Sequence, residues 1–194
     1  MEINKIDLKY NILVKEQAGF RSREKCVAQA TCLYEIVKRR KIELNPTYVA
    51  FIDFEKAYDK VPHDLLMIKL QQNKIGGNLL KVIKSLYQCP EMVVRCGNEI
   101  SRTFKYCCGV RQGCPMSPIL FDIYINDIFE GMDGVEAPGL EEKIPGLLFA
   151  DDAVILADSE ISLKNSFLKL NLWAEKWKMK INNKKCGVIP VDAS

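Results

Sequence analysis

Two adjacent aspartates, Asp151 and Asp152, are the residues most suggestive of chemistry in this chain. They separate two short apolar runs, 147–150 and 153–157, which are typical of paired strands. Asp-Asp is a poor two-residue hairpin loop, because such loops favour Asn-Gly or Asp-Gly. Two carboxylates in apolar surroundings repel each other and resist desolvation, and a divalent cation such as Mg²⁺ removes both problems. A solvated Asp-Asp turn explains the pair equally well on these residues alone.

A third aspartate, Asp53, follows the apolar run 48–52, which has the composition of a buried strand. If this strand lies beside the two that flank Asp151 and Asp152, three carboxylates converge from two strands. Such a set suits a pair of metal ions about 3.5–4 Å apart that catalyse phosphoryl transfer. A capping or turn aspartate is the alternative interpretation of Asp53.

A shaped loop over residues 109–118 contains two glycines and two prolines and leads into a helix. Ser117 is expected as the N-cap of that helix and Pro118 as its first residue. Backbone amides at this position could contact a phosphate or a base pair. A stiff connector is the alternative.

The elements that must position these residues follow from apolar periodicity and turn residues. Helices are expected over 26–40, 63–73, 78–87, 118–132 and from Ser159 to 177, and strands over 48–52, 92–96, 100–106, 147–150, 153–157 and 187–190. Strands and helices mix without strict alternation. The order therefore favours an α+β fold, with an antiparallel sheet covered by helices on one face.

Composition excludes several classes of protein. The 194 residues are 48% hydrophobic and 27% charged, which predicts one globular domain rather than a disordered chain. No run of eighteen apolar residues and no signal peptide is visible, so we expect an intracellular protein that makes no use of a membrane. The net charge is only +3, but lysines gather over 164–185 and basic residues over 38–41. Each of these two basic segments is interpreted as a solvated face, and contact with the backbone of a nucleic acid is the alternative.

The thiol and imidazole groups argue against other chemistries. Eight cysteines form no C-x-x-C pair, and one histidine, His63, cannot complete the usual zinc sets. Reduced thiols packed as small apolar residues are the expected state. The lone histidine also disfavours a Ser-His-Asp hydrolase and a Cys-His protease; its place after Pro62 predicts a helix start.

Taken together, residues 16–190 resemble the reverse transcriptases of non-LTR (LINE-type) retrotransposons. Five ordered segments bear the resemblance: 16–21, 51–59, 110–118 continuing through 124–127, 149–152, and Trp177 with 179–182 and Lys185. Group II intron enzymes are a second relative, and retroviral enzymes fit less well because they usually have Met at the position of Ala150. Cys186 and Met116 are mild departures from the family pattern.

The resemblance implies a right-hand polymerase palm with partial fingers. Residues 1–46 would be the partial fingers, and 47–194 the palm with an insertion at about 63–108. A thumb, an endonuclease and an RNase H segment would be missing, so we expect a truncated retrotransposon fragment with weak activity.

The family's site residues are carried over as expectations. Asp53, Asp151 and Asp152, with the Phe54 carbonyl, would hold two Mg²⁺ ions, for which Mn²⁺ is a possible substitute. Tyr58 would be the steric gate that excludes a ribose 2′-hydroxyl, and Gln112 and Gly113 would line the pocket of the nascent base pair. Arg21, with Arg23 as a weaker candidate, would reach the triphosphate. Lys185 would be the general acid for the leaving pyrophosphate.

The implied function is RNA-directed DNA polymerisation, with an RNA template, a DNA primer and dNTPs as partners. The first alternative is a catalytically inactive nucleic-acid-binding remnant. The second is another two-metal enzyme such as a palm-type nucleotide cyclase, against which the loop at 110–118 argues.

Overall fold

A four-stranded antiparallel sheet forms the centre of the structure, a computed structural model that describes residues 12–21 and 24–191. The strand order is β6–β7–β1–β8, with bounds Gly146–Phe149, Asp152–Ala157, Thr47–Ile52 and Gly187–Val191. Side chains alternate between the two faces of the sheet, so Ala50 and Ile52 lie on one face and Val49 on the other. The antiparallel sheet expected from the sequence is confirmed.

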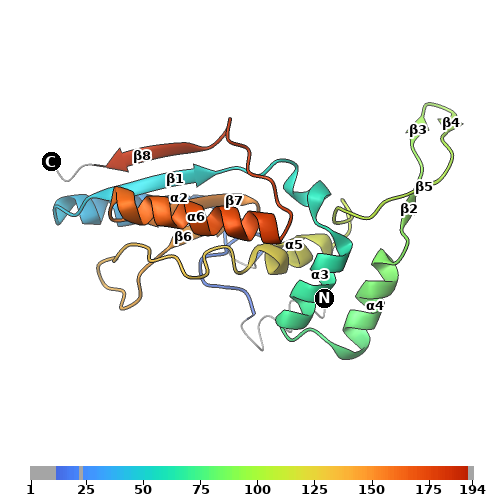
Figure 1. Ribbon diagram of the computed structural model, residues 1–194, viewed down its shortest axis with the longest axis horizontal. Coiled ribbons are helices and arrows are strands. Elements are labelled where there is room, and N and C mark those ends of the chain that lie inside the picture. Colours follow the sequence, from blue (N-terminus) through green and yellow to red (C-terminus); the bar gives the residue numbers. More distant parts are fainter. Residues whose placement is uncertain (1–11, 22–23, 192–194) are drawn as a thin grey trace.

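Helices and one short 3₁₀ helix surround the sheet and extend beyond one end of it (Figure 1). The helices are α2 (Cys26–Ile42), α3 (His63–Gln72), α4 (Gly77–Tyr87), α5 (Ser117–Ile125) and α6 (Glu160–Lys176), and η1 is the 3₁₀ helix Ala57–Lys60. Ser159 caps α6, because its hydroxyl accepts a hydrogen bond from the Ser162 amide. α3 begins at His63, as expected. The Nε2 atom of that histidine lies 2.9 Å from the Gly109 carbonyl oxygen.

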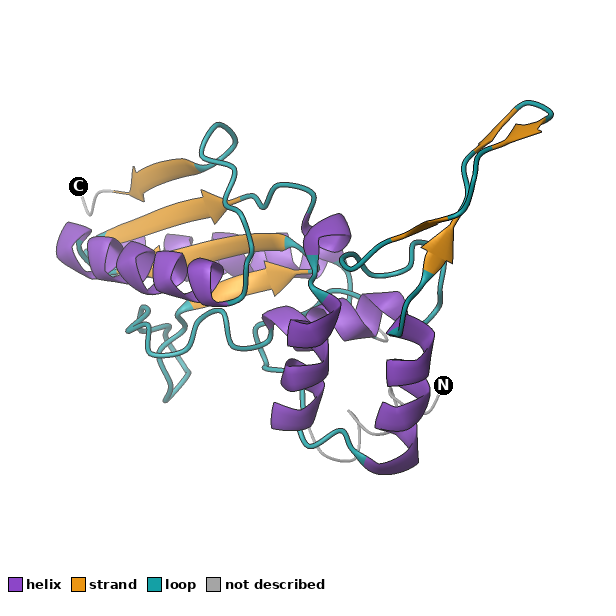
Figure 2. Cartoon of the chain, turned by 45° about the vertical axis from the view of Figure 1, so that its right-hand side comes forward, coloured by secondary structure: helices purple, strands orange, loops and turns teal. Residues whose placement is uncertain are grey.

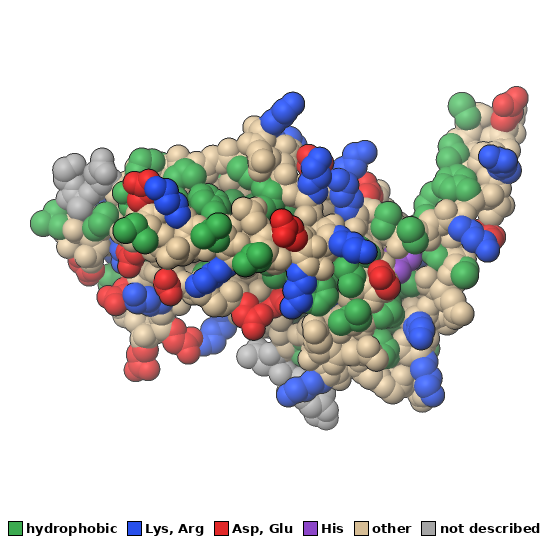
Figure 3. All heavy atoms as spheres, in the orientation of Figure 1, with side chains coloured by type: hydrophobic (Ala, Val, Ile, Leu, Met, Phe, Trp, Pro, Cys, Tyr) green, Lys and Arg blue, Asp and Glu red, His purple; other side chains and the backbone are tan. Residues whose placement is uncertain are grey.

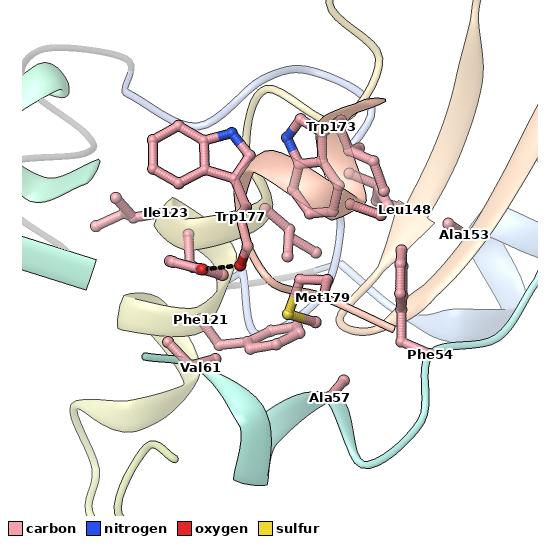
Figure 4. Packing of buried hydrophobic residues seen from close by; sticks show 14 of the residues in the cluster. Phe54, Ala57, Val61, Phe121, Ile123, Leu148, Ala153, Trp173, Trp177 and Met179 are labelled. Atoms are coloured by element: carbon pink, nitrogen blue, oxygen red, sulfur yellow. Dashed lines mark hydrogen bonds between the residues drawn. The ribbon is translucent and has the colours of Figure 1, made fainter. Parts of the chain in front are cut away.

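The main core lies between α6, α5 and one face of the sheet. Trp173 and Trp177 of the α6 segment pack with Phe54, Phe121 and Met179 in one buried cluster (Figure 4). The Tyr124 hydroxyl donates a hydrogen bond to the Trp177 carbonyl, so α5 and the end of α6 are joined inside this core. Phe54, which follows β1 in the chain, is thereby anchored in the main core.

The opposite face of the sheet is also covered, which corrects the expectation of helices on one face alone. Ile36 of α2 packs against Val49 of β1 and Leu156 of β7, with the half-buried Leu33 and Val37 beside them. Both faces of the central strands are apolar, so each needs a covering layer. Val27 and Tyr34 of the same helix are 73% and 61% exposed, so only part of its apolar surface packs on the sheet.

A narrow hairpin projects away from the rest of the chain (Figure 2). It consists of two short ladders, β2 (Glu91–Met92) with β5 (Phe104–Lys105) and β3 (Arg95–Cys96) with β4 (Glu99–Ile100). Apolar side chains are exposed along it, among them Val94 and Ile100 (Figure 3). A turn at Gly97-Asn98 joins β3 to β4. The two continuous strands predicted over 92–96 and 100–106 are broken into these shorter pieces.

The apolar helix predicted over 118–132 ends at Ile125, and its cap differs from the expected one. Met116 is the N-cap, while Ser117 lies inside the helix and donates through its hydroxyl to the Arg111 carbonyl at 2.6 Å. Beyond Ile125 the chain continues in tighter turns, with the Ile128 amide donating to the Ile125 carbonyl. The Asn126 side chain bonds the backbone of residues 12 and 14. In the described part of the chain, no helix is long and apolar enough to cross a membrane.

Candidate active site

Asp53 and Asp152 lie side by side on neighbouring strands. In the β1–β7 ladder Phe51 is paired with Val154 and Ile52 with Ala153, so continuing the register places Asp53 opposite Asp152. Both aspartates line a cavity of about 420 Å³ between α2 and the sheet, which Lys185 also borders. The sheet therefore brings together two carboxylates that are 99 positions apart in the sequence.

Asp151 lies in the turn that joins β6 to β7, and the turn is shifted by one residue from the expected one. Phe149 pairs with Asp152, so Asp152 is the first residue of β7 and the two turn residues are Ala150 and Asp151. Ala150 has a φ of +58°, in the left-handed region. A tight hairpin turn needs positive φ, and here an alanine rather than an aspartate adopts it.

The three carboxylates share one electrostatic environment. The pKa of Asp152 is raised, first by burial and then by the negative charges of Asp151 and Asp53. Burial also raises the pKa of Tyr58, and the charge of Asp151 is among the further causes. Surplus negative charge on hard oxygen donors is the condition that Mg²⁺ relieves, so the residues present fit such an ion in chemical type.

The Asp53 carboxylate has protein partners of its own. The Asn182 side chain donates to Asp53 Oδ2 at 2.9 Å, and Lys185 Nζ lies 4.0 Å from the same oxygen. In residues 12–21 and 24–191, no three acidic, histidine or cysteine side chains stand close enough together to enclose a metal ion. The Asp53 carboxylate would have to exchange its contacts with Asn182 and Lys185 to share an ion with Asp151 and Asp152.

The backbone beside Asp53 is held by the segment that follows α6. Asn182 N donates to the Asp53 carbonyl, and Glu55 N donates to the Lys180 carbonyl, each at 2.8 Å. Among the described residues, these bonds leave the carbonyl of Phe54 unused. The role of the Phe54 carbonyl as a further metal ligand stays a prediction.

Three other predicted residues meet in a second cavity of about 460 Å³. Tyr58, Gln112 and Gly113 all line it. The Tyr58 ring stacks on Phe121 with a centroid distance of 4.3 Å, and Gln112 Nε2 donates to Asp59 Oδ1 at 2.8 Å. Gly113 has a φ of +80°, a conformation that other residues rarely adopt.

Predicted basic residues lie in different settings. Arg21 donates to the carbonyl oxygens of Val14 and Gln17, each at 3.2 Å, so it braces its own loop. Arg23 lies outside the described residues. Arg40, from the basic run 38–41, is buried and donates to Thr47 Oγ1 and to the Pro46 and Glu136 carbonyls, which removes it from any nucleic-acid surface.

Two residues at the site were given no role by the sequence. Asn182 bonds Asp53 through both its backbone and its side chain. Gln17 bonds Ala150 at the turn. Both residues lie in segments that bear the family resemblance, 16–21 and 179–182, but their contacts span more than 120 positions, so the fold is needed to show what each one bonds.

Comparison with known proteins identifies the family to which the chain belongs. Residues 2–192 match the family model described as reverse transcriptase (RNA-dependent DNA polymerase). The chain belongs to the reverse transcriptase family. Curated relatives within this family include proteins of the R2 element, 25% identical over 183 residues in Nasonia vitripennis and 29% identical over 185 residues in Popillia japonica. A protein of the mobile element jockey in Drosophila melanogaster is 29% identical over 144 residues.

These relatives are much longer than the present reverse transcriptase chain. The matches cover 93%, 92% and 71% of this chain but only 18%, 26% and 15% of the R2 and jockey proteins. Among solved structures, apo telomerase from Candida tropicalis truncated from its C-terminal domain matches with a TM-score of 0.72 and 16% identity, over 100% of this chain and 40% of that one. The same telomerase in complex with a TWJ fragment of telomeric RNA gives a TM-score of 0.71 and 14% identity, over 97% and 33%. At these identities the solved structures support the fold alone.

Proposed function

We propose that this chain is the polymerising domain of an RNA-directed DNA polymerase, which adds dNTPs to the 3′-hydroxyl of a DNA primer paired with an RNA template. The observation that supports this most strongly is the pairing of Asp53 with Asp152 on one face of the sheet, with Asp151 in the adjoining turn. In this proposal the sheet with α5 and α6 is the palm, and residues 1–46 belong to the fingers.

Asp53, Asp151 and Asp152, with the Phe54 carbonyl, would hold two Mg²⁺ ions, and Mn²⁺ would substitute. When bound, such ions lower the pKa of an attacking hydroxyl and stabilise the charge on the leaving oxygen. The raised pKa of Asp152 supports the assignment, because a cation favours the ionised carboxylate that burial and the charges of Asp151 and Asp53 disfavour. The hydrogen bond from the Asn182 side chain to Asp53 Oδ2 would then break, or the same carboxylate would keep it and also bind the ion.

Tyr58 would exclude ribonucleotides by occupying the space that a 2′-hydroxyl needs. Its ring is fixed by stacking on Phe121, so it is a rigid wall rather than a mobile side chain. Its hydroxyl is buried and has no hydrogen-bond partner among the described residues, and the residue lines the adjoining cavity. Gln112 and Gly113, on the same cavity, would pack against the nascent base pair.

Lys185 would donate a proton to the leaving pyrophosphate. It is 70% exposed and lies near Asp53, at the border of the cavity, so it can reach a ligand there. Arg21 would have to leave the carbonyls of Val14 and Gln17 to meet a triphosphate. The exposed lysines of 164–185 would contact the phosphate backbones of template and primer, which predicts strongly salt-dependent binding.

Primer extension on an RNA template annealed to a DNA primer tests the proposal, with Asp151→Asn as the matched control. We expect Mg²⁺-dependent incorporation of dNTPs by the 194-residue chain and its loss in the variant. Incorporation no higher than that of Asp151→Asn would reject polymerase activity. Salt-sensitive duplex binding that is equal in both proteins, with no extension, would support the nucleic-acid-binding alternative instead.

A further inference from the structure

We infer that Gln17 is a positioning residue that fixes the Ala150–Asp151 turn and thereby aims the aspartates at the metal ions. The inference rests on the proposed function, because a fixed turn matters for catalysis only if Asp151 and Asp152 bind ions. It assigns a role to the segment before α2, which lies 133 positions from the turn in the sequence.

The Gln17 side-chain amide forms hydrogen bonds with both the backbone N–H and the backbone carbonyl of Ala150. Its Oε1 accepts a hydrogen bond from Ala150 N at 3.1 Å, and its Nε2 donates to the Ala150 carbonyl at 3.3 Å. Oε1 also accepts from Gly19 N at 2.7 Å, which fixes the amide itself. Gln17 is 1% exposed, so no water competes for these bonds.

The turn needs such a clamp because its conformation is unfavourable for alanine. A left-handed φ at a residue with a Cβ persists only where the surrounding structure determines it. Backbone bonds align the two segments beside the turn: Ala18 N donates to the Leu148 carbonyl, and Leu148 N donates to the Glu16 carbonyl. Within the described chain, the Gln17 amide alone makes side-chain hydrogen bonds to Ala150.

Gly19 shows how closely the clamping segment approaches. A Cβ built at Gly19 would lie 2.2 Å from Ala150 N and 2.8 Å from Gln17 Oε1. No side chain fits between the two segments, so the backbone of residues 17–19 packs directly against the turn. The segment is therefore a rigid support for Asp151, rather than a loop that happens to lie near it.

The test compares Gln17→Met with Gln29→Met. Gln29 is the matched control, because its amide donates to the Glu16 and Leu148 carbonyls and so joins the same two segments without touching the turn. Mn²⁺ binding to each 194-residue protein, without nucleic acid, is measured by electron paramagnetic resonance. Amide hydrogen exchange of the 146–157 peptide is measured in parallel, and thermal unfolding verifies that each variant folds.

For Gln17→Met we expect Mn²⁺ affinity to fall by about 10–100-fold, the usual effect of removing a group that orients a ligand. We also expect faster exchange at the turn than in Gln29→Met. Gln17→Glu retains the acceptor for Ala150 N and should exchange more slowly than Gln17→Met. Equal Mn²⁺ affinity and equal exchange in Gln17→Met and Gln29→Met would overturn the inference.

The failure of the inference is distinguishable from failure of the proposed function. If the unmutated chain binds no Mn²⁺, the metal site and the catalytic part of the inference fail together. Hydrogen exchange at residues 150–152 still reports whether Gln17 fixes the turn. If Mn²⁺ binds tightly and is insensitive to Gln17→Met, the proposed function stands and the positioning role is rejected.

Discussion

Replacing Asp127 by Asn should destabilise the protein strongly, because it removes the counter-charge of a buried lysine. Lys69 of α3 is 1% exposed, and its ammonium group bonds Asp127 Oδ1 and lies 3.8 Å from the centroid of the Trp177 ring. Trp173 Nε1 donates to the same aspartate oxygen at 2.6 Å. One carboxylate therefore joins α3 to α6 inside the main core.

The expected magnitude follows from the burial of the lysine. Removing one partner of a buried ion pair costs about 3–5 kcal/mol, because the other charge is left uncompensated. An asparagine oxygen can still accept hydrogen bonds, so we expect about 3 kcal/mol for Asp127→Asn. In a domain of this size that lowers the melting temperature by about 6–12 °C. Lys69→Met also removes one partner, but the Asp127 side chain is 31% exposed and keeps its hydrogen bond from Trp173, so its charge stays solvated. We therefore expect Lys69→Met to cost less, about 1 kcal/mol.

The pH dependence gives an independent check. Burial lowers the pKa of Lys69 from its ordinary value of 10.5, although Asp127 opposes the shift. The unfolded chain then binds more protons than the folded chain as pH approaches 10.5, so this lysine makes stability rise with pH in that range. Lys69→Met should lose that rise. Urea unfolding followed by circular dichroism at several pH values measures both effects, and a Lys69→Met protein less stable than Asp127→Asn would refute the reasoning.

Three further predictions follow from the site and its supports. Tyr58→Val should raise the incorporation of ribonucleotides relative to deoxynucleotides by roughly tenfold or more, since the wall of the cavity is removed, and competition primer extension measures the ratio. Gly19→Ala should lower the free energy of unfolding by about 1–3 kcal/mol and weaken Mn²⁺ binding, because its methyl group would lie 2.2 Å from Ala150 N. An unchanged free energy of unfolding would contradict the close approach of the two segments. Arg40→Met should cost about 3 kcal/mol, because Thr47 and the Pro46 and Glu136 carbonyls each lose a donor, and thermal unfolding tests this. A loss below 1 kcal/mol for Arg40→Met would show that water replaces the guanidinium there.

The sequence predicted most elements, because their apolar periodicity is local. The strand before Asp53, the helix that Ser159 caps and the last strand all lie within two residues of their expected bounds. The helix expected over 118–132 was too long, because the apolar pattern continues past Ile125 while the backbone changes to tighter turns there.

The site was predicted in its residue types but not in its supports. Asp53 and the Asp151-Asp152 pair each follow or separate an apolar strand, a pattern visible in the sequence. The exact turn, with Ala150 rather than an aspartate at positive φ, depends on the register of Phe149 with Asp152. Gln17 lies in the recognised segment 16–21, but its contact with Ala150 spans 133 positions, and that contact cannot be seen in the sequence.

The central claim is that Asp53, Asp151 and Asp152 jointly hold a pair of divalent ions. Anomalous diffraction from crystals of the chain grown with Mn²⁺, primer–template and dNTP tests it most directly. The account predicts two peaks about 3.5–4 Å apart, bounded by these three carboxylates, with the Asp53 side chain turned from Asn182 toward the ions. Peaks elsewhere, or no peak with Asp53 still bonded to Asn182, would contradict it.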